Sequence, residues 1–201
     1  MAPPDHVPSV IPRIPARTGA SFGLVALAAW ASLYGVAASS YAGYDPRVNF
    51  LSDLGHPLAT NAWAFNAACI LAGLLYVPYS LSVGHVLGGR AGLAGSALLL
   101  AANGFLVLVG VFPEESPNNL HFIASAAFFL LLTLSAGVLA LPLHASRAFG
   151  PGSGILAGAV VAGGVVLVAS RVDPLWEHVA VGLGLTWSLW NAGRLLRLAA
   201  G

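Results

Sequence analysis

The chain has 201 residues, of which 58% are hydrophobic and 7% are charged, and its mean hydropathy is +0.84. A soluble domain of this length would carry about a quarter charged residues, so the composition excludes an ordinary soluble enzyme and indicates an integral membrane protein. The formal net charge is only +1, and we expect membrane lipids, not nucleic acid, as partners.

The first 19 residues differ in composition from the rest of the chain. They contain five prolines and two arginines, and proline interrupts a helix because its ring clashes with the preceding turn and removes a backbone donor. We therefore expect residues 1–19 to be a flexible, proline-rich cytoplasmic tail. Residues 20–201 are expected to form a single transmembrane domain.

Six stretches of the chain are long and apolar enough to span a bilayer. About 20 residues cross the hydrocarbon core as an α-helix, and the bilayer satisfies no backbone polar groups, so long unbroken apolar runs predict helices. The predicted spans are residues 20–42, 61–87, 91–112, 120–143, 153–170 and 175–197. The predicted fold is therefore an all-α integral membrane protein, a bundle of six transmembrane helices.

The arginines predict how this bundle is oriented. One side of the membrane holds the tail, the C-terminus, the turn between the second and third spans and the loop between the fourth and fifth spans. Six of the eight arginines fall on this side, together with a single acid, Asp5. The other side holds two arginines and six acids. Because arginine is retained on the cytoplasmic side, both termini are expected in the cytoplasm of a cell that carries the protein in its plasma membrane.

The three predicted outer loops share one feature: each brings at least one carboxylate and one histidine. They contain the sequences NFLSDLGH (49–56), FPEESPNNLH (112–121) and RVDPLWEH (171–178). If residues 49–56 are helical, Asn49 lies one turn from Asp53, and Ser52 one turn from His56. The candidate catalytic residues are Asp53, His56, Glu114, His121 and His178, and the candidate substrate-binding residues are Arg47, Asn49, Ser52 and Arg171.

Three interpretations of this polar cluster remain open. His56, His121 and His178 could be three nitrogen ligands of a catalytic zinc ion. Alternatively, Arg47 and Arg171 could hold a phosphate while a carboxylate or histidine acts as base, without a metal. The third interpretation is structural: the acids pair with arginines, and the histidines cap helices at the membrane surface.

Other residue types limit the possible cofactors. The chain has no lysine, which excludes a Schiff base with retinal or pyridoxal phosphate. Its one cysteine, Cys69, lies in an apolar run and is expected to be a buried packing residue. Asn103, near the middle of the third span, is expected to line an internal cavity.

Several motifs resemble a known prokaryotic membrane family. The segment N-x-x-S-D-L-G, here Asn49 to Gly55, is followed by N-A-W-A-F-N at 61–66 and by G-V-F-P-E … H between Gly110 and His121. These resemble the family catalogued as domain of unknown function 998, and the resemblance covers residues 20–197. It implies a six-helix bundle and supplies no activity.

The leading functional hypothesis is recognition or modification of a lipid or isoprenoid headgroup at the outer site. If the protein is an enzyme, we expect a membrane-embedded lipid hydrolase or transferase. One alternative is a non-catalytic subunit or scaffold that packs against a homo-oligomer or a larger complex through the small-residue faces of the third and fifth spans. A small-solute carrier is a further alternative, disfavoured by the lack of ionisable groups near the membrane centre.

Overall fold

The structure is a computed structural model that describes residues 13–200, and every regular element in that range is helical. Six α-helices and two short 3₁₀ segments follow one another along the chain. Their bounds are α1 Ala16–Ser40, η1 Ser52–Gly55, α2 Ala62–Leu87, α3 Gly89–Val111, η2 Pro117–Asn119, α4 Leu120–Ala145, α5 Pro151–Ala169 and α6 Pro174–Leu198. The all-α prediction is confirmed.

Length and composition make this a membrane protein. The helices α1 to α5 are each long and apolar enough to cross a bilayer. The sixth helix has a similar length, 25 residues, but it is less apolar because it contains Glu177, Asn191, Arg194 and Arg197. We therefore attribute the position of α6 in the bundle to its packing against α5 and α1.

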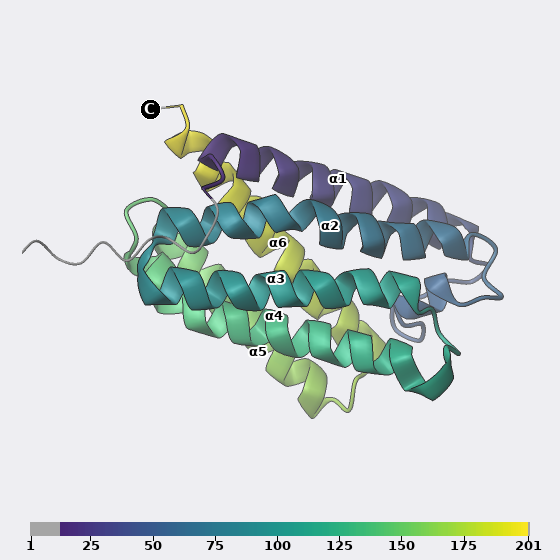
Figure 1. Ribbon diagram of the computed structural model, residues 1–201. Coiled ribbons are helices and arrows are strands. Elements are labelled where there is room, and N and C mark those ends of the chain that lie inside the picture. Colours follow the sequence, from purple (N-terminus) through teal and green to yellow (C-terminus); the bar gives the residue numbers. More distant parts are fainter. Residues whose placement is uncertain (1–12, 201) are drawn as a thin grey trace, which may run out of the picture.

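The helices form a ring in which each packs against its neighbours in sequence. Figure 1 shows α1 to α5 lying one below the other, with α6 passing behind them. α6 packs against both α5 and α1 and so closes the ring. Because α6 closes the ring between α5 and α1, elements from the whole length of the chain surround the interior of the bundle.

Small residues allow the neighbouring helices to approach closely. A Cβ atom added at Gly73 would lie 2.6 Å from the backbone oxygen of Asn103, and one at Gly154 would lie 2.5 Å from the backbone oxygen of Ala140. Such small-residue contacts replace the hydrophobic effect, which does not drive helices together in lipid. Gly158, one turn after Gly154 on α5, has open space around it.

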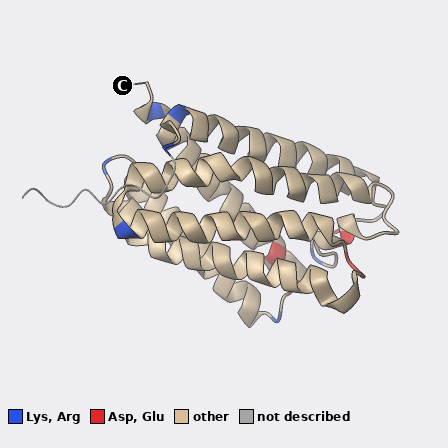
Figure 2. Ribbon diagram, viewed as in Figure 1, with Lys and Arg blue, Asp and Glu red and all other residues tan. Residues whose placement is uncertain are grey.

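Charge is divided between the two ends of the bundle, as Figure 2 shows. One end, called here the arginine end, carries Arg13, Arg17, Arg90, Arg147, Arg194 and Arg197. The opposite end, called here the acidic end, consists of residues 41–61, 112–119 and 170–173 and the helix ends that adjoin them. Both ends of the described chain lie at the arginine end (Figure 1), so the predicted grouping of the loops is confirmed.

The first helix begins earlier than predicted. It starts at Ala16, directly after Pro15, whereas the tail was expected to extend to residue 19. Proline fits immediately before a helix because the first turn needs no donor from it. The rest of the proposed tail, residues 1–12, lies outside the described residues.

Candidate functional site

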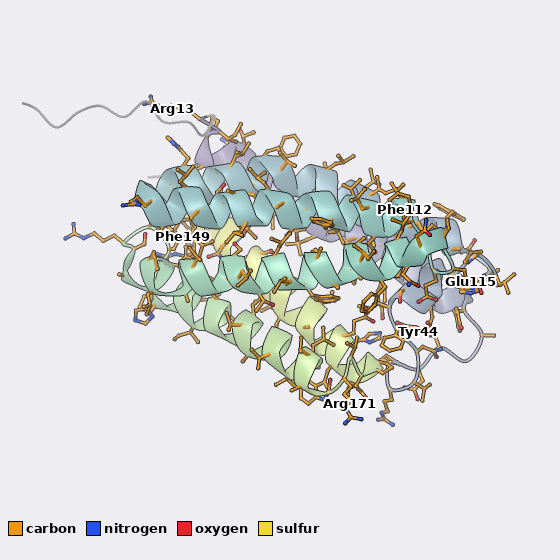
Figure 3. All side chains as sticks on the ribbon, turned by 60° about the horizontal axis from the view of Figure 1, so that its bottom comes forward. Arg13, Tyr44, Phe112, Glu115, Phe149 and Arg171 are labelled. Atoms are coloured by element: carbon orange, nitrogen blue, oxygen red, sulfur yellow. The ribbon has the colours of Figure 1, made fainter. Side chains whose placement is uncertain are left out.

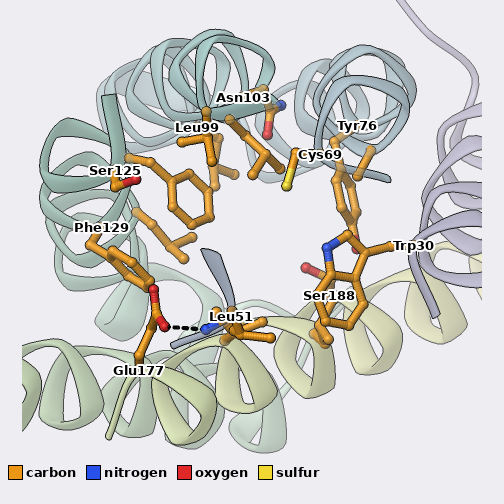
Figure 4. A pocket seen from close by; sticks show the side chains of 18 of the residues that line it. Trp30, Leu51, Cys69, Tyr76, Leu99, Asn103, Ser125, Phe129, Glu177 and Ser188 are labelled. Carbon is orange, nitrogen blue, oxygen red and sulfur yellow. Dashed lines mark hydrogen bonds between the residues drawn. The ribbon is translucent and has the colours of Figure 1, made fainter. Parts of the chain in front are cut away.

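A cavity of about 100 Å³ occupies the interior of the ring (Figure 4). Four helices and the loop after α1 supply most of its wall, and α1 adds Trp30, whereas α5 supplies no lining residue. Most of the lining is aliphatic or aromatic, for example Leu99, Phe129 and Val181. The cavity therefore offers an apolar interior within the membrane-spanning part of the protein.

The cavity is long and narrow. On α6 its lining extends from Glu177, in the first turn, to Ser188, which corresponds to about 16 Å along the helix axis. On α2 it extends from Phe65 to Ser80, or about 22 Å. A small volume spread over this length has the shape of a single extended chain.

Glu177 is a buried carboxylate at the acidic end of the cavity. It is 8% exposed, and its Oε2 atom accepts a hydrogen bond of 2.7 Å from the backbone N–H of Leu51. Within the described part of the chain it has no cationic partner. Its position in the first turn of α6 is favourable because the positive end of the helix dipole lies there.

The loop that contains NFLSDLG closes this end of the cavity. The Oδ2 atom of Asp53 accepts hydrogen bonds from the Asn49 side chain (3.0 Å) and the Phe50 backbone (3.1 Å), which confirms the predicted neighbourhood of Asn49 and Asp53. The segment is a turn followed by the 3₁₀ helix η1, not a continuous α-helix. Asp53 thus holds the loop in shape, and Ser52, the next residue toward the N-terminus, lines the cavity.

A second contact fixes this loop to α2. The Asn66 side chain donates a hydrogen bond to the backbone oxygen of Gly55, at 3.2 Å. Gly55 is buried so tightly that an added Cβ would lie 2.4 Å from the Asn66 oxygen and 2.7 Å from the ring of Phe65. The motifs NFLSDLG and NAWAFN therefore pack directly against each other.

His178 is held between α6 and the loop. Its Nδ1 atom lies 2.7 Å from the backbone oxygen of Pro174, and its Nε2 atom lies 2.6 Å from the hydroxyl of Tyr44. Because a carbonyl can only accept, Nδ1 carries a proton, and in the neutral ring Nε2 accepts from Tyr44. Burial, followed by the neighbouring Tyr34, raises the pKa of Tyr44, which keeps this phenol protonated as the donor.

His121 is oriented in a similar way at the start of α4. Its Nδ1 atom lies 2.7 Å from the backbone oxygen of Phe112, and its Nε2 atom lies 3.4 Å from the hydroxyl of Ser125. Ser125, one turn further along α4, lines the cavity. Asn119 precedes α4 as its N-cap, with a left-handed backbone and without a side-chain hydrogen bond.

His56 lies apart from the other two histidines. Its Nε2 atom is 3.3 Å from a carboxylate oxygen of Glu115, a side chain that is 70% exposed. Its Nδ1 atom accepts a hydrogen bond from the backbone of Leu58. It belongs to a shallow surface hollow with Tyr41 and Thr60 and does not line the cavity.

The predicted anion-binding arginines and the remaining candidate acid also lie outside the cavity wall. Arg47 and Arg171 are exposed on separate loops, and Figure 3 places Arg171 at the acidic end with Tyr44, Phe112 and Glu115. Glu114 is half-buried and close enough to Glu177 to act on it electrostatically, as is Asp53. The role of the arginines in binding an anion stays a prediction.

The three histidines do not fit a shared zinc site. No group of three or more histidine, cysteine, aspartate or glutamate side chains within residues 13–200 is placed to hold a metal ion. The Nδ1 atoms of His121 and His178 face backbone carbonyls, and their Nε2 atoms face hydroxyls from different elements. We therefore derive no step through a metal.

The other end of the cavity contains polar side chains that are paired with one another. The Asn103 side chain donates to the hydroxyl of Ser80 at 3.0 Å, and the Ser96 hydroxyl donates to the backbone oxygen of Ser80 at 2.9 Å. Tyr79 donates to the backbone oxygen of Ser188. Asn103 lines the cavity and Cys69 is buried, as the sequence predicted, and Cys69 also lines the cavity.

Two residues of the site were missed at the sequence level. Glu177 was counted as an outer acid and was not assigned a role, although an acid in the first turn of an apolar helix is expected to be functional. Ser125 was not among the candidate site residues. No periodic pattern marks which face of α4 is interior, because Phe122, Ile123 and the other exposed residues of that helix are as apolar as the buried ones.

A comparison with protein families gives a match over most of the chain. Residues 24–193 match the family described as "Protein of unknown function (DUF998)". No curated protein and no solved structure is similar enough to this chain to count as a match.

Proposed function

The chain belongs to the DUF998 family, whose description assigns no activity, and we propose that it binds one lipid or isoprenoid chain in its central cavity. With the arginine end in the cytoplasm of a cell whose plasma membrane holds the protein, the acidic end faces the outer leaflet. A bound lipid would then place its polar end group at the acidic end and its tail toward the middle of the bundle.

The observation that carries this proposal is the difference between the two ends of the cavity. At the inner end, Ser80 and Asn103 are bonded to each other. At the acidic end, the hydroxyl of Ser52 and one oxygen of Glu177 have no hydrogen-bond partner among residues 13–200. A carboxylate oxygen and a hydroxyl are free at the acidic end, and the wall beyond them is mostly apolar, with the uncharged hydroxyl of Tyr76 unpaired within it. This arrangement matches a molecule with one strongly polar end.

The shape of the cavity supports a single chain as the ligand. About 100 Å³ is too little for a two-chain lipid and its headgroup, whereas a narrow space about 16 Å long accepts one extended hydrocarbon. The hydroxyl of Tyr76 also lines this space and has no partner within the described part of the chain. Since buried polar groups are normally hydrogen-bonded, it is available to an oxygen in the ligand or to water.

The charge near Glu177 favours a particular class of headgroup. The charged side chains that act electrostatically on Glu177 are those of Asp53 and Glu114. Within the described range Glu177 makes no ion pair. This surrounding disfavours a phosphate next to Glu177 and favours an amine or a hydroxyl, which can donate a hydrogen bond to the carboxylate.

A matched pair of glycine substitutions on α6 tests the proposal. Gly184 lines the cavity, whereas Gly182 is exposed and a Cβ added there would meet nothing within 4 Å. The same change, Gly184→Leu and Gly182→Leu, therefore fills the cavity in one variant only. We expect lipid retained through purification, measured by native mass spectrometry, to fall at least about tenfold in the first variant and to stay unchanged in the second.

The opposite results would contradict the proposal. Equal lipid retention in both variants would mean that the lipid sits on the outer surface of the bundle. Absence of any retained lipid in the unmodified protein, together with no capture of a photoactivatable fatty alcohol by cavity residues, would exclude the cavity as a lipid site.

The two alternative functions find less support in the geometry. Gly95 and Gly110 of α3 and Gly154 and Gly164 of α5 are in close contact within the chain, so most of the small-residue surface that a scaffold would offer is already used. For a carrier, a path through the protein is required, but the lining of the cavity ends near Ser80 and Leu99.

A further inference from the structure

His121 and Ser125 have the arrangement of a general base and a nucleophile. The Nδ1–H group of His121 donates to the backbone oxygen of Phe112 at 2.7 Å, so in the neutral ring the lone pair lies on Nε2. That atom is 3.4 Å from the hydroxyl oxygen of Ser125. A base held in one tautomer by a third group, next to a hydroxyl, is the arrangement that activates a serine, and such contacts are often long without substrate.

The hydroxyl of Ser125 is not satisfied by the backbone of its own helix. Ser40, Ser153 and Thr186 each donate to a backbone oxygen four residues earlier in the same helix. This bond is the common way for a helical hydroxyl to be satisfied. Ser125 makes no such bond, and its one polar contact within residues 13–200 is with Nε2 of His121.

The position of Ser125 relates it to the proposed lipid site. It lines the cavity from α4, and Glu177 lines the cavity from α6. Figure 4 shows Ser125 and Glu177 on the same side of the cavity, with Phe129 between them. A lipid whose hydrocarbon chain occupies the apolar part of the cavity would place the atoms near its polar end next to Ser125.

We propose that Ser125 and His121 cleave the carboxylic ester of a lipid whose acyl chain occupies the cavity, an inference that rests on the proposed lipid binding. The oxygen of Ser125 bonds to the ester carbonyl carbon while Nε2 of His121 takes the hydroxyl proton. The bond from that carbon to the alcohol oxygen then breaks, and the proton passes from His121 to the departing alcohol. Water attacks the acyl-serine in the same way, which releases the fatty acid and restores the serine.

Labelling with alkyl fluorophosphonates tests the reactive serine directly. The purified protein in nanodiscs is treated with a long-chain and a short-chain alkyl fluorophosphonate, and intact mass reports the adduct. We expect one adduct per chain, formed at least tenfold faster with the long alkyl chain. Ser125→Ala is expected to abolish the adduct, and His121→Ala to slow its formation at least tenfold.

Ser39→Ala is the matched control, because Ser39 is exposed on α1, lies outside the cavity wall and donates its hydroxyl to the backbone oxygen of Val36. It should be labelled at the rate of the unmodified protein. Hydrolysis of p-nitrophenyl palmitate should follow the same order among the variants. Ser125→Cys, which keeps a nucleophile, provides a second test if Ser125→Ala does not fold, and alkylation of that thiol by a long-chain iodoacetamide should then exceed alkylation of Cys69 at least tenfold.

The two proposals fail in distinguishable ways. Retained lipid in the unmodified protein without any fluorophosphonate adduct would overturn the esterase and leave lipid binding intact. An adduct that persists in Ser125→Ala would also overturn the esterase. Equal lipid retention in Gly184→Leu and Gly182→Leu would instead remove the lipid site on which the esterase rests, whatever the reactivity of Ser125.

Discussion

The acidic end of the bundle has two sides that use the same residue types differently. On the cavity side lie Glu177, Ser125 and His121, and on the outer side lie His56 and Glu115. Each of these three cavity-side residues makes a hydrogen bond to a backbone atom or a neighbouring side chain, as in the bond from Leu51 to Glu177. On the outer side, the pair formed by His56 with Glu115 is largely solvated.

This difference teaches that composition alone does not make a site. Both sides carry an imidazole next to an oxygen-bearing side chain. On the cavity side, a backbone carbonyl sets which nitrogen of His121 is protonated, and Ser125 lines the cavity. Only there does a base held in one tautomer lie beside a hydroxyl that lines a mostly apolar cavity.

The largest expected effect on stability comes from crowding the loop that closes the cavity. Gly55→Ala places a Cβ atom against Asn66 and Phe65 and should lower the free energy of unfolding by about 2–3 kcal/mol. Gly35→Ala, in open space on α1, is the control and should be neutral. Thermal unfolding in detergent measures both; similar midpoints for the two variants would show that the loop does not depend on this contact.

A smaller effect should separate the two kinds of histidine. His178→Ala removes the hydrogen bonds to Tyr44 and Pro174 and should cost about 1–2 kcal/mol, because the half-buried phenol loses its acceptor. His56→Ala removes a largely solvated contact with Glu115 and should cost about 0–1 kcal/mol. The unfolding midpoints of the two variants measure this difference. A lower midpoint for His56→Ala than for His178→Ala would contradict the distinction between the two sides.

Glu177→Gln should change binding more than stability. The amide oxygen of glutamine can still accept the hydrogen bond from Leu51, so we expect a stability change below about 1 kcal/mol. Retention of a single-chain amine should nevertheless fall several-fold because the charge is lost, whereas retention of the matching fatty alcohol should not. Glu114→Gln, which neutralises a nearby acid outside the cavity wall, is the control, and a larger loss there would place the headgroup elsewhere.

The smallest effect is expected from the exposed arginines. Changing both Arg47 and Arg171 to glutamine should shift the free energy of unfolding by no more than about 0.5 kcal/mol, since neither side chain is buried. The profile of retained lipids, measured by mass spectrometry, should also be unchanged. A selective loss of phosphate-bearing lipids would instead support the anion site predicted from the sequence.

The sequence by itself determined the membrane class, the helical segments and the division of charge between the ends. It also predicted that Asn103 lines a cavity, because an apolar run leaves few partners for a polar side chain. That Asn49 neighbours Asp53 was predicted from a spacing of four residues, and the contact forms although the segment is a turn followed by a 3₁₀ helix. These features depend on composition and local spacing, which do not require knowledge of how the helices are arranged.

Only the tertiary structure decided which polar residues face the interior. Lipid is as apolar as the centre of a bundle, so a transmembrane helix has no hydrophobic stripe that marks its buried face. Successive helical residues point about 100° apart, and this rotation aims Glu177 into the cavity while His178 bonds to Tyr44. The closure of α6 against α1 then places Glu177 and Ser125, distant in sequence, on one cavity.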